Sequence, residues 1–202
     1  MAEPRLGHDF LTDLDADAVS GWPNFPFKGE LQVKTVRPFE SHDHVRDGDP
    51  GGPPCGCEPG HEDEPRARRR RVWSNGTWEV THINFSPDRP APFPAYMLQT
   101  VEHKDFGDFT EADAAELGVM TLRMQRAIQA IGGVGRVHFN RWGDGGAHFH
   151  VWFLGRPLGA WQLSGFTLPL WGFILPPLDE AVRAGNDEIV RASLAAADGA
   201  TA

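Results

Sequence analysis

The stretch from Arg136 to Pro157 constrains this chain most, because it carries two histidines in an alternating pattern. If Ala147 to Leu154 is a β-strand, successive side chains point to opposite faces. The three apolar residues of one face are Phe149, Val151 and Phe153. The other face carries His148, His150 and Trp152, whose burial is costly unless a ligand, metal or substrate meets them. We therefore expect a functional site on this strand.

The preceding segment, Arg136 to Trp142, is predicted to be the partner strand of a hairpin, with residues 143–146 as its glycine-rich turn. Keeping one face buried favours an odd-length loop centred on Gly145. This register predicts two facing pairs, Asn140 opposite His150 and His138 opposite Trp152. An amide then lies beside a histidine, and His138 is interpreted as structural.

Residues 148–152 resemble the His-x-His-x-His signature of the histidine-triad (HIT) superfamily, with Trp152 in the third place. They are most similar to the branch near galactose-1-phosphate uridylyltransferase, which has glutamine there. Residues 96–103 and the helix start at residues 109–110 also resemble the family's strand, histidine turn and first long helix. The resemblance covers Val72 to Pro157 and implies the HIT α+β arrangement, commonly dimeric.

The resemblance implies a nucleotidyl hydrolase or transferase that acts on a nucleoside phosphate ester, anhydride or phosphoramidate. In HIT proteins the middle histidine attacks the α-phosphate and forms a nucleotidyl-histidine; here that residue is His150, preceded by His148. Trp152 retains one N–H donor and lacks the proton-transfer capacity of histidine. The expected donors to the phosphoryl group are Gly145, Gly146 and the Asn140 amide.

Cys55 and Cys57 lie in a loop rich in proline and glycine, too close in sequence for an easy structural disulfide. They resemble a displaced form of the Cys-x-x-Cys of the uridylyltransferase branch, where two cysteines and two histidines hold zinc. The resemblance implies a closed structural zinc set made of Cys55, Cys57, His103 and His148. Alternative histidine ligands are His42, His44 and His61, and reduced cysteines without metal are the other interpretation.

Two further functions remain open. Because Trp152 cannot replace histidine in proton transfer, the chain could be a nucleotide-binding module with little turnover. Alternatively, the histidine strand could be purely a metal site in a zinc-supported structural or interaction protein. The arginines between residues 66 and 71 are interpreted as a solvated run, with phosphate contact as the alternative.

The hydrophobic pattern predicts an α+β fold, with an antiparallel sheet of about five strands, one long helix and a C-terminal helix. Strands are predicted over residues 30–38, in a hairpin over residues 72–80 that turns at Asn75-Gly76, over residues 95–101, and in the hairpin described above. The long helix is expected to begin at Thr110 and end at Gly132-Gly133. Its apolar stripe is predicted to comprise Leu117, Thr121, Met124, Ile128 and Ile131. The C-terminal helix, residues 177–196, is expected to bury Val182, Ile189, Val190 and Leu194.

Four segments are predicted along the chain. They are a mobile N-terminal segment (1–20), an extended segment with the cysteine loop (21–71), a HIT-like core (72–157), and an irregular Trp/Pro-rich segment followed by the C-terminal helix (158–202). Residues 158–175 are expected to lie across the site or a partner subunit.

Charge and hydropathy exclude some function classes. The chain of 202 residues carries a net charge of −9, which argues against non-specific binding to nucleic acid. No apolar run reaches the about 18 residues that a membrane span needs, and the N-terminus has no secretory pattern. We expect a cytoplasmic protein without membrane contact that binds a nucleotide or nucleotide conjugate and forms a homodimer.

Overall fold

The computed structural model describes residues 25–27, 43–58, 60–61, 70–86 and 89–199. The chain separates into two compact units, residues 1–43 and 44–202, and each is considered by itself. In the first unit, the rings of Phe25 and Phe27 meet edge to face with centroids 5.4 Å apart. The strand expected over residues 30–38 and the mobile segment expected over residues 1–20 fall outside the described residues.

The second unit is built on a five-stranded antiparallel sheet, as predicted, with the strand order β1-β2-β5-β7-β6. Its strands are β1 (Arg71–Ser74), β2 (Trp78–His82), β5 (Ala95–Thr100), β6 (Val134–Asn140) and β7 (His150–Pro157). The connection between β2 and β5, predicted without strands, contains the short antiparallel pair β3 (Asn84–Ser86) and β4 (Arg89–Pro90).

The hairpin of β1 and β2 turns at Asn75-Gly76, as predicted. Gly76 has a φ of 94°, a conformation that favours glycine. The Asn75 side-chain oxygen accepts hydrogen bonds from the backbone N–H groups of Thr77 at 3.1 Å and Trp78 at 2.8 Å. These local bonds fix the turn that begins the sheet.

The long helix α2 (Glu111–Ala130) begins and ends where the sequence predicts. Thr110 and Asp113 form a reciprocal capping box at its start. Gly132 and Gly133 follow its end with φ values of 80° and 65°. The buried positions of this helix are Met120, Met124, Ala127 and Ile128. Leu117 and Ile131 of the predicted stripe pack partly buried against the same core.

The C-terminal helix α4 (Glu180–Gly199) buries a different stripe from the predicted one. Its buried residues are Asp187, Val190 and Leu194, whereas Val182 and Ile189 are exposed, so these two assignments were wrong. The reason is a polar anchor within the stripe. The Asp187 carboxylate accepts hydrogen bonds from His82 Nε2 at 2.9 Å and the Tyr96 hydroxyl at 3.3 Å, both on the sheet. The anchor turns Val182 and Ile189 away from the sheet.

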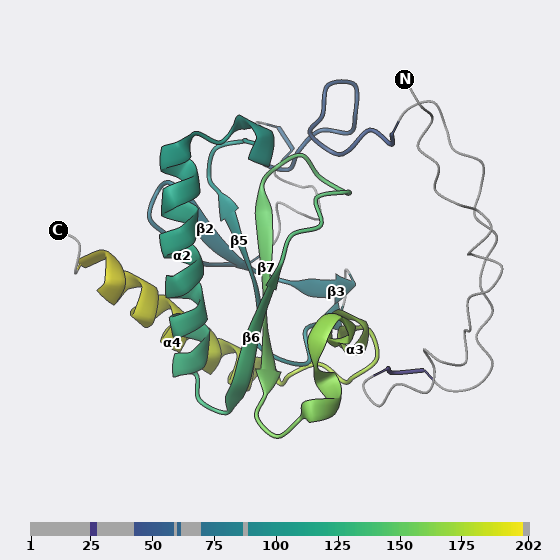
Figure 1. The fold of residues 1–202 in the computed structure, drawn as a ribbon, viewed down its shortest axis with the longest axis vertical. Coiled ribbons are helices and arrows are strands. Elements are labelled where there is room, and N and C mark those ends of the chain that lie inside the picture. Colours follow the sequence, from purple (N-terminus) through teal and green to yellow (C-terminus); the bar gives the residue numbers. More distant parts are fainter. Residues whose placement is uncertain (1–24, 28–42, 59, 62–69, 87–88, 200–202) are drawn as a thin grey trace. The chain divides into compact units, whose positions relative to one another are not determined.

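The two faces of the sheet have separate cores. Helices α2 and α4 lie on one face, over a cluster that includes Trp78, Leu98 and Phe153 (Figure 1). On the other face, Leu168 of the short helix α3 (Leu168–Gly172) packs with Met97 and Leu154. Residues 158–175 are therefore not wholly irregular, because α3 is preceded by the 3-10 helices η3 (Trp161–Leu163) and η4 (Gly165–Thr167).

In the part of the chain that the structure describes, no helix combines the length and apolar character of a membrane span.

Candidate functional site

Strand β7 places its two histidine-signature side chains, His150 and Trp152, on the face opposite Val151 and Phe153, as predicted. Val151 and Phe153 are buried in the core beneath the helices, together with Phe149 just before the strand. His150 and Trp152 are half-buried on the opposite face. The strand begins at His150 rather than at Ala147, because the loop before it is held by other parts of the chain.

The predicted register of the β6–β7 hairpin was wrong by two residues. The observed pairs are Asn140 with Trp152 and His138 with Leu154. The number of residues between paired positions is odd, as predicted, so each side chain stays on its predicted face. The shift arises because residues 141–149 form a long loop instead of a tight turn.

This glycine loop, residues 141–149, is fastened to the cysteine loop, residues 44–58. The Ala147 N–H donates to the Asp47 carbonyl at 2.9 Å, and the Asp47 N–H donates to the Gly145 carbonyl at 3.4 Å. The Phe149 N–H donates to the Lys104 carbonyl at 2.7 Å. These bonds satisfy backbone groups that a hairpin would otherwise pair, and they extend the loop beyond the sheet.

A cleft of about 990 Å³ lies on the histidine face of the sheet. Its floor is made by β1, β2, β5 and β7, and its walls are the cysteine loop and the glycine loop. The predicted site residues that line it are Cys55, Cys57, Gly145, Gly146, His148, His150 and Trp152. Asn140, the other predicted phosphate donor, is not part of the lining, since it pairs with Trp152 farther from His150.

The His150 ring is held by the backbone of the residue two positions before it. Its Nδ1 lies 2.8 Å from the carbonyl oxygen of His148. A carbonyl oxygen can only accept, so Nδ1 carries the hydrogen and Nε2 carries the lone pair of the neutral ring. The arrangement fixes the ring and makes Nε2 its nucleophilic nitrogen.

Trp152 lies in an aromatic corner of the cleft. Its ring meets the edges of Trp142 at 5.3 Å and Phe85 at 6.1 Å between centroids. Trp142 also lines the cleft and is 49% exposed. The third position of the signature is therefore packed among aromatic rings, next to a second tryptophan that the sequence did not single out.

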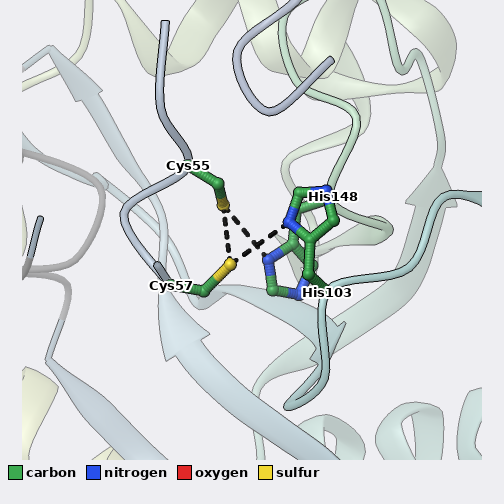
Figure 2. Close-up of side chains that lie close together, drawn as sticks. All are labelled: Cys55, Cys57, His103 and His148. Carbon is green, nitrogen blue, oxygen red and sulfur yellow. Dashed lines mark hydrogen bonds between the residues drawn. The ribbon is translucent and has the colours of Figure 1, made fainter. Parts of the chain in front are cut away.

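The four predicted metal ligands lie together at one end of the cleft. Cys55, Cys57, His103 and His148 turn toward one another from three segments of the chain (Figure 2). Their potential ligand atoms all lie within 4.8 Å of one another. Cys55 Sγ is 3.4 Å from His148 Nδ1, and Cys57 Sγ is 3.2 Å from His103 Nδ1. Two thiols and two imidazoles are the donor set of a closed tetrahedral zinc site, so the cluster fits zinc.

The two thiols differ in acidity. Burial raises the pKa of the Cys55 thiol, but hydrogen bonds from His148 and Cys57 outweigh it and bring this pKa to about 6. Burial and the adjacent Cys55 sulfur both raise the pKa of Cys57. Burial alone would lower the pKa of His148, yet its contacts with Cys55 and the Thr100 carbonyl raise it. The cluster therefore favours a thiolate at Cys55, which prepares the site for a cation.

A glycine allows the cysteine loop to approach His103. Gly48 has a φ of 87°, and a Cβ built there would lie 2.6 Å from His103 Cε1. Of the alternative histidines, His44 and His61 are not in the cluster, and His42 is outside the described residues.

The arginine run is described only at its end. Arg70 pairs with Glu180 at 2.9 Å and Arg71 with Glu79 at 2.7 Å. Arg71 lines the cleft, whereas residues 66–69 are outside the described part of the chain.

Sequence reasoning missed the ion pairs that join the two loops. The Asp105 carboxylate accepts from Arg46 Nη2 at 2.7 Å and from Arg141 Nη2 at 2.9 Å. Arg46 lies in the cysteine loop and Arg141 begins the glycine loop, while Asp105 follows the predicted ligand His103 by two residues. Only this proximity to His103 could have pointed to Asp105, and nothing in the sequence identifies its two partners.

Comparison with known proteins gives a match at the level of the fold. No family model and no curated protein matches the chain. A histidine triad protein from Bradyrhizobium japonicum is similar in structure, with a TM-score of 0.51 and 19% identity over 65% of this chain and 94% of that one. A histidine triad protein from Sinorhizobium meliloti gives a TM-score of 0.49 and 20% identity, over 62% and 89%. A Zn-bound histidine triad family protein from Mycobacterium smegmatis gives 0.46 and 19%, over 66% and 89%. The first similarity shows a shared fold, and the two TM-scores below 0.5 carry no further argument.

Proposed function

From the histidine-triad fold of this chain, we propose that it is a nucleotidyl hydrolase or transferase that works through His150. The observation that carries the proposal is the hydrogen bond from His150 Nδ1 to the His148 carbonyl at 2.8 Å. It makes Nε2 the nucleophilic nitrogen of a ring that lines the cleft. The substrate is a nucleoside phosphate ester, anhydride or phosphoramidate.

The reaction has two displacements at phosphorus. His150 Nε2 attacks the α-phosphorus, an N–P bond forms, and the bond to the leaving group breaks with its electron pair going to the leaving group. Water or an acceptor hydroxyl then attacks phosphorus, an O–P bond forms, the N–P bond returns its electron pair to Nε2, and the proton of the attacking hydroxyl passes to solvent. The His148 carbonyl stabilises the positive charge that the ring gains during the first displacement.

The glycine loop is assigned to the phosphoryl group. Gly145 and Gly146 line the cleft together with His150, and backbone N–H groups in such loops bind anionic oxygens. Asn140 is a weaker candidate for this role than its expected position suggested, because it faces Trp152. Trp152 supplies an aromatic wall beside the reaction centre.

The proposed metal is a structural zinc ion held by Cys55, Cys57, His103 and His148. When bound, zinc cross-links the cysteine loop to the start of the histidine strand and supplies no chemistry to the displacement. His148 links the two functions of this strand, because its side chain belongs to the metal set and its carbonyl orients His150.

A second candidate function is nucleotide binding with little turnover. It is favoured by the residue at the third signature position. Trp152 packs against Trp142 and Phe85 there, and an indole cannot move a proton as a histidine would. Replacing Trp152 with His distinguishes the candidates. A large gain in turnover indicates that the wild-type chain is a binder, whereas unchanged turnover indicates that His150 suffices.

Intact mass spectrometry tests the proposed chemistry. The protein is incubated with nucleoside phosphoramidates, dinucleoside polyphosphates and nucleotide sugars and quenched without acid. We expect a nucleotide-sized adduct that is absent from His150→Ala and present in His138→Gln, a control histidine on the neighbouring strand. Failure to form adduct or product, with nucleotide still raising the melting temperature, would favour the binding module. If no adduct or product forms and nucleotide does not raise the melting temperature, the nucleotide assignment is contradicted.

A further inference from the structure

Arginines gather in a part of the chain that is almost free of acidic residues. The whole chain carries a net charge of −9, yet residues 117–178 contain five arginines, no lysine and a single acidic residue, Asp144. Two of these arginines are Arg136 on β6 and Arg156 on β7. Their hydrogen-bond partners among the described residues are backbone carbonyls, so neither guanidinium charge is balanced by a described carboxylate.

Arg136 and Arg156 lie directly opposite each other in the β6–β7 pair. Residues in such positions share one face of the sheet, and like charges there repel. This is the face of α3, because Leu154, two residues before Arg156, packs with Leu168 of α3 (Figure 1). Six residues of strand separate Arg156 from His150, so the pair lies about 20 Å from the proposed nucleophile. Neither arginine lines the cleft.

The two guanidinium groups converge on Gly135. Arg136 Nη1 donates to the Gly135 carbonyl oxygen at 2.9 Å. A Cβ built on Gly135 would lie 2.9 Å from Arg156 Nη2, so the missing side chain leaves room for the second guanidinium. Because both positive charges approach the same residue, a single anionic group placed there can contact both of them.

Arg156 is a buried cation, with 7% of its surface exposed. A buried guanidinium without a negative partner destabilises the fold. Its Nη1 donates to the Pro157 carbonyl at 3.3 Å, and its Cζ lies 5.8 Å from the centre of the Trp161 ring. A carbonyl dipole and an aromatic face offset a full charge only in part. Nε and Nη2 have no hydrogen-bond partner among the described residues and are not among the fully enclosed side-chain atoms, so they can donate to a ligand.

The groups around the pair select the ligand chemistry. A phosphate or carboxylate accepts two hydrogen bonds from a guanidinium group, and its negative charge offsets the repulsion between the two arginines. The neighbouring surface is apolar, since Trp161 is 76% exposed and Leu158 is 73% exposed. Leu158 also adjoins Gly135, because its Cα would lie 3.2 Å from the same added Cβ. An anion that carries an apolar body therefore fits better than an inorganic ion.

We infer that Arg136 and Arg156 form a binding site for an organic anion, with its phosphate or carboxylate group between the two guanidinium groups and its apolar body over Trp161. The site is separate from the cleft, and the inference does not rest on the proposed function. His150 can form a nucleotide adduct or fail to form one without any consequence for this site.

Calorimetric titration of the full chain at low ionic strength tests the site. The probes are phenyl phosphate and benzoate, each compared with its counterpart without a ring, inorganic phosphate or acetate. Arg136→Gln should weaken the tighter-binding probe about 10-fold or more, because one charge-assisted contact is lost. Arg126→Gln is the control, since it makes the same change in net charge at an exposed arginine of α2, on the other face of the sheet. Its affinities should stay within about two-fold of wild type.

The probes identify the anionic group. Tighter binding of phenyl phosphate supports the site and assigns it to a phosphate, provided that Arg136→Gln weakens that binding. Tighter binding of benzoate, under the same condition, supports the site and assigns it to a carboxylate. The inference is overturned if wild type binds no probe, if Arg136→Gln binds as wild type does, or if the ring-bearing probes bind no better than their counterparts.

Two further readouts separate a binding site from a structural role. Arg136→Gln removes one of two facing positive charges, so its melting temperature without probe should equal or exceed that of wild type. His138, two residues along the same face of β6, is the second reporter. Burial and the Arg156 charge lower the pKa of its imidazole, so a bound anion should raise that pKa in an NMR titration. A lower melting temperature of Arg136→Gln, together with a His138 pKa that the probe leaves unchanged, overturns the inference.

Discussion

The backbone carbonyl oxygen of Thr100 lies 2.7 Å from Nε2 of His148, and this contact determines the tautomer of the histidine. The carbonyl accepts the Nε2 hydrogen, so Nδ1 carries the lone pair and is the nitrogen nearest Cys55 Sγ. The last residue of β5 thus orients a predicted metal ligand. A metal at this site would cross-link β5, the cysteine loop and the strand of His150.

Metal analysis is the first prediction. We expect purified protein to contain one zinc ion per chain, and a chelator to lower its melting temperature by about 10 °C or more, because the cysteine loop loses its cross-link. Cys57→Ser and His103→Ala should lose the metal. His44→Ala should keep it, since His44 lies outside the cluster. Wild-type protein without stoichiometric metal contradicts the zinc assignment.

The Asp105 ion pairs give the second prediction. Asp105→Asn weakens the bonds to Arg46 and Arg141 and should lower the free energy of unfolding by about 1–2 kcal/mol. Because these bonds hold the two walls of the cleft together, nucleotide affinity should also fall. Calorimetry and urea unfolding measure both effects. Glu102→Gln serves as the exposed carboxylate control. Unchanged affinity in a destabilised Asp105→Asn would mean that the pairs support the fold alone.

The sequence predicted local features well. The Asn75-Gly76 turn and the Thr110 cap depend on neighbours in the chain, and both lie where expected. The alternation of Phe149, Val151 and Phe153 reflects burial on one face, which is independent of the exact register. Of the candidate site, the four proposed metal ligands come together, while their occupancy and the roles of the histidines remain predictions.

Long-range polar contacts caused the errors. The hairpin register depends on Asp47, which lies about a hundred residues before the loop that it pairs with, and no periodicity reveals such a bond. The face of α4 depends on Asp187, a charged residue that hydropathy places in solvent. The homodimer and the cytoplasmic location likewise remain predictions, because the single chain does not test them.

The third prediction concerns the buried carboxylate of Asp187. Asp187→Ala leaves the buried donors of His82 and Tyr96 unpaired and should lower the free energy of unfolding by about 3 kcal/mol. The matched control is Glu188→Ala, one residue later, because that side chain is 73% exposed and its ion pair with Arg191 lies on the helix surface. It should cost less than about 0.5 kcal/mol. Equal losses in urea unfolding would contradict the polar anchor of α4.

The fourth prediction is a pH dependence that originates at His138. Burial and the nearby Arg156 guanidinium lower the pKa of this imidazole below 6.5, and no described residue hydrogen-bonds its Nε2. The folded state therefore prefers the neutral ring. Its contribution to stability is fully present above pH 6.5 and is lost as the pH falls through the lower, folded-state pKa.

His138→Gln should accordingly flatten the fall in unfolding free energy between about pH 7.5 and pH 5. Because the substitution also changes strand packing, the slope against pH is the readout and absolute stability is not. His44→Gln, at an exposed histidine, should retain the wild-type slope. A wild-type slope in His138→Gln would show that other groups carry the acid sensitivity.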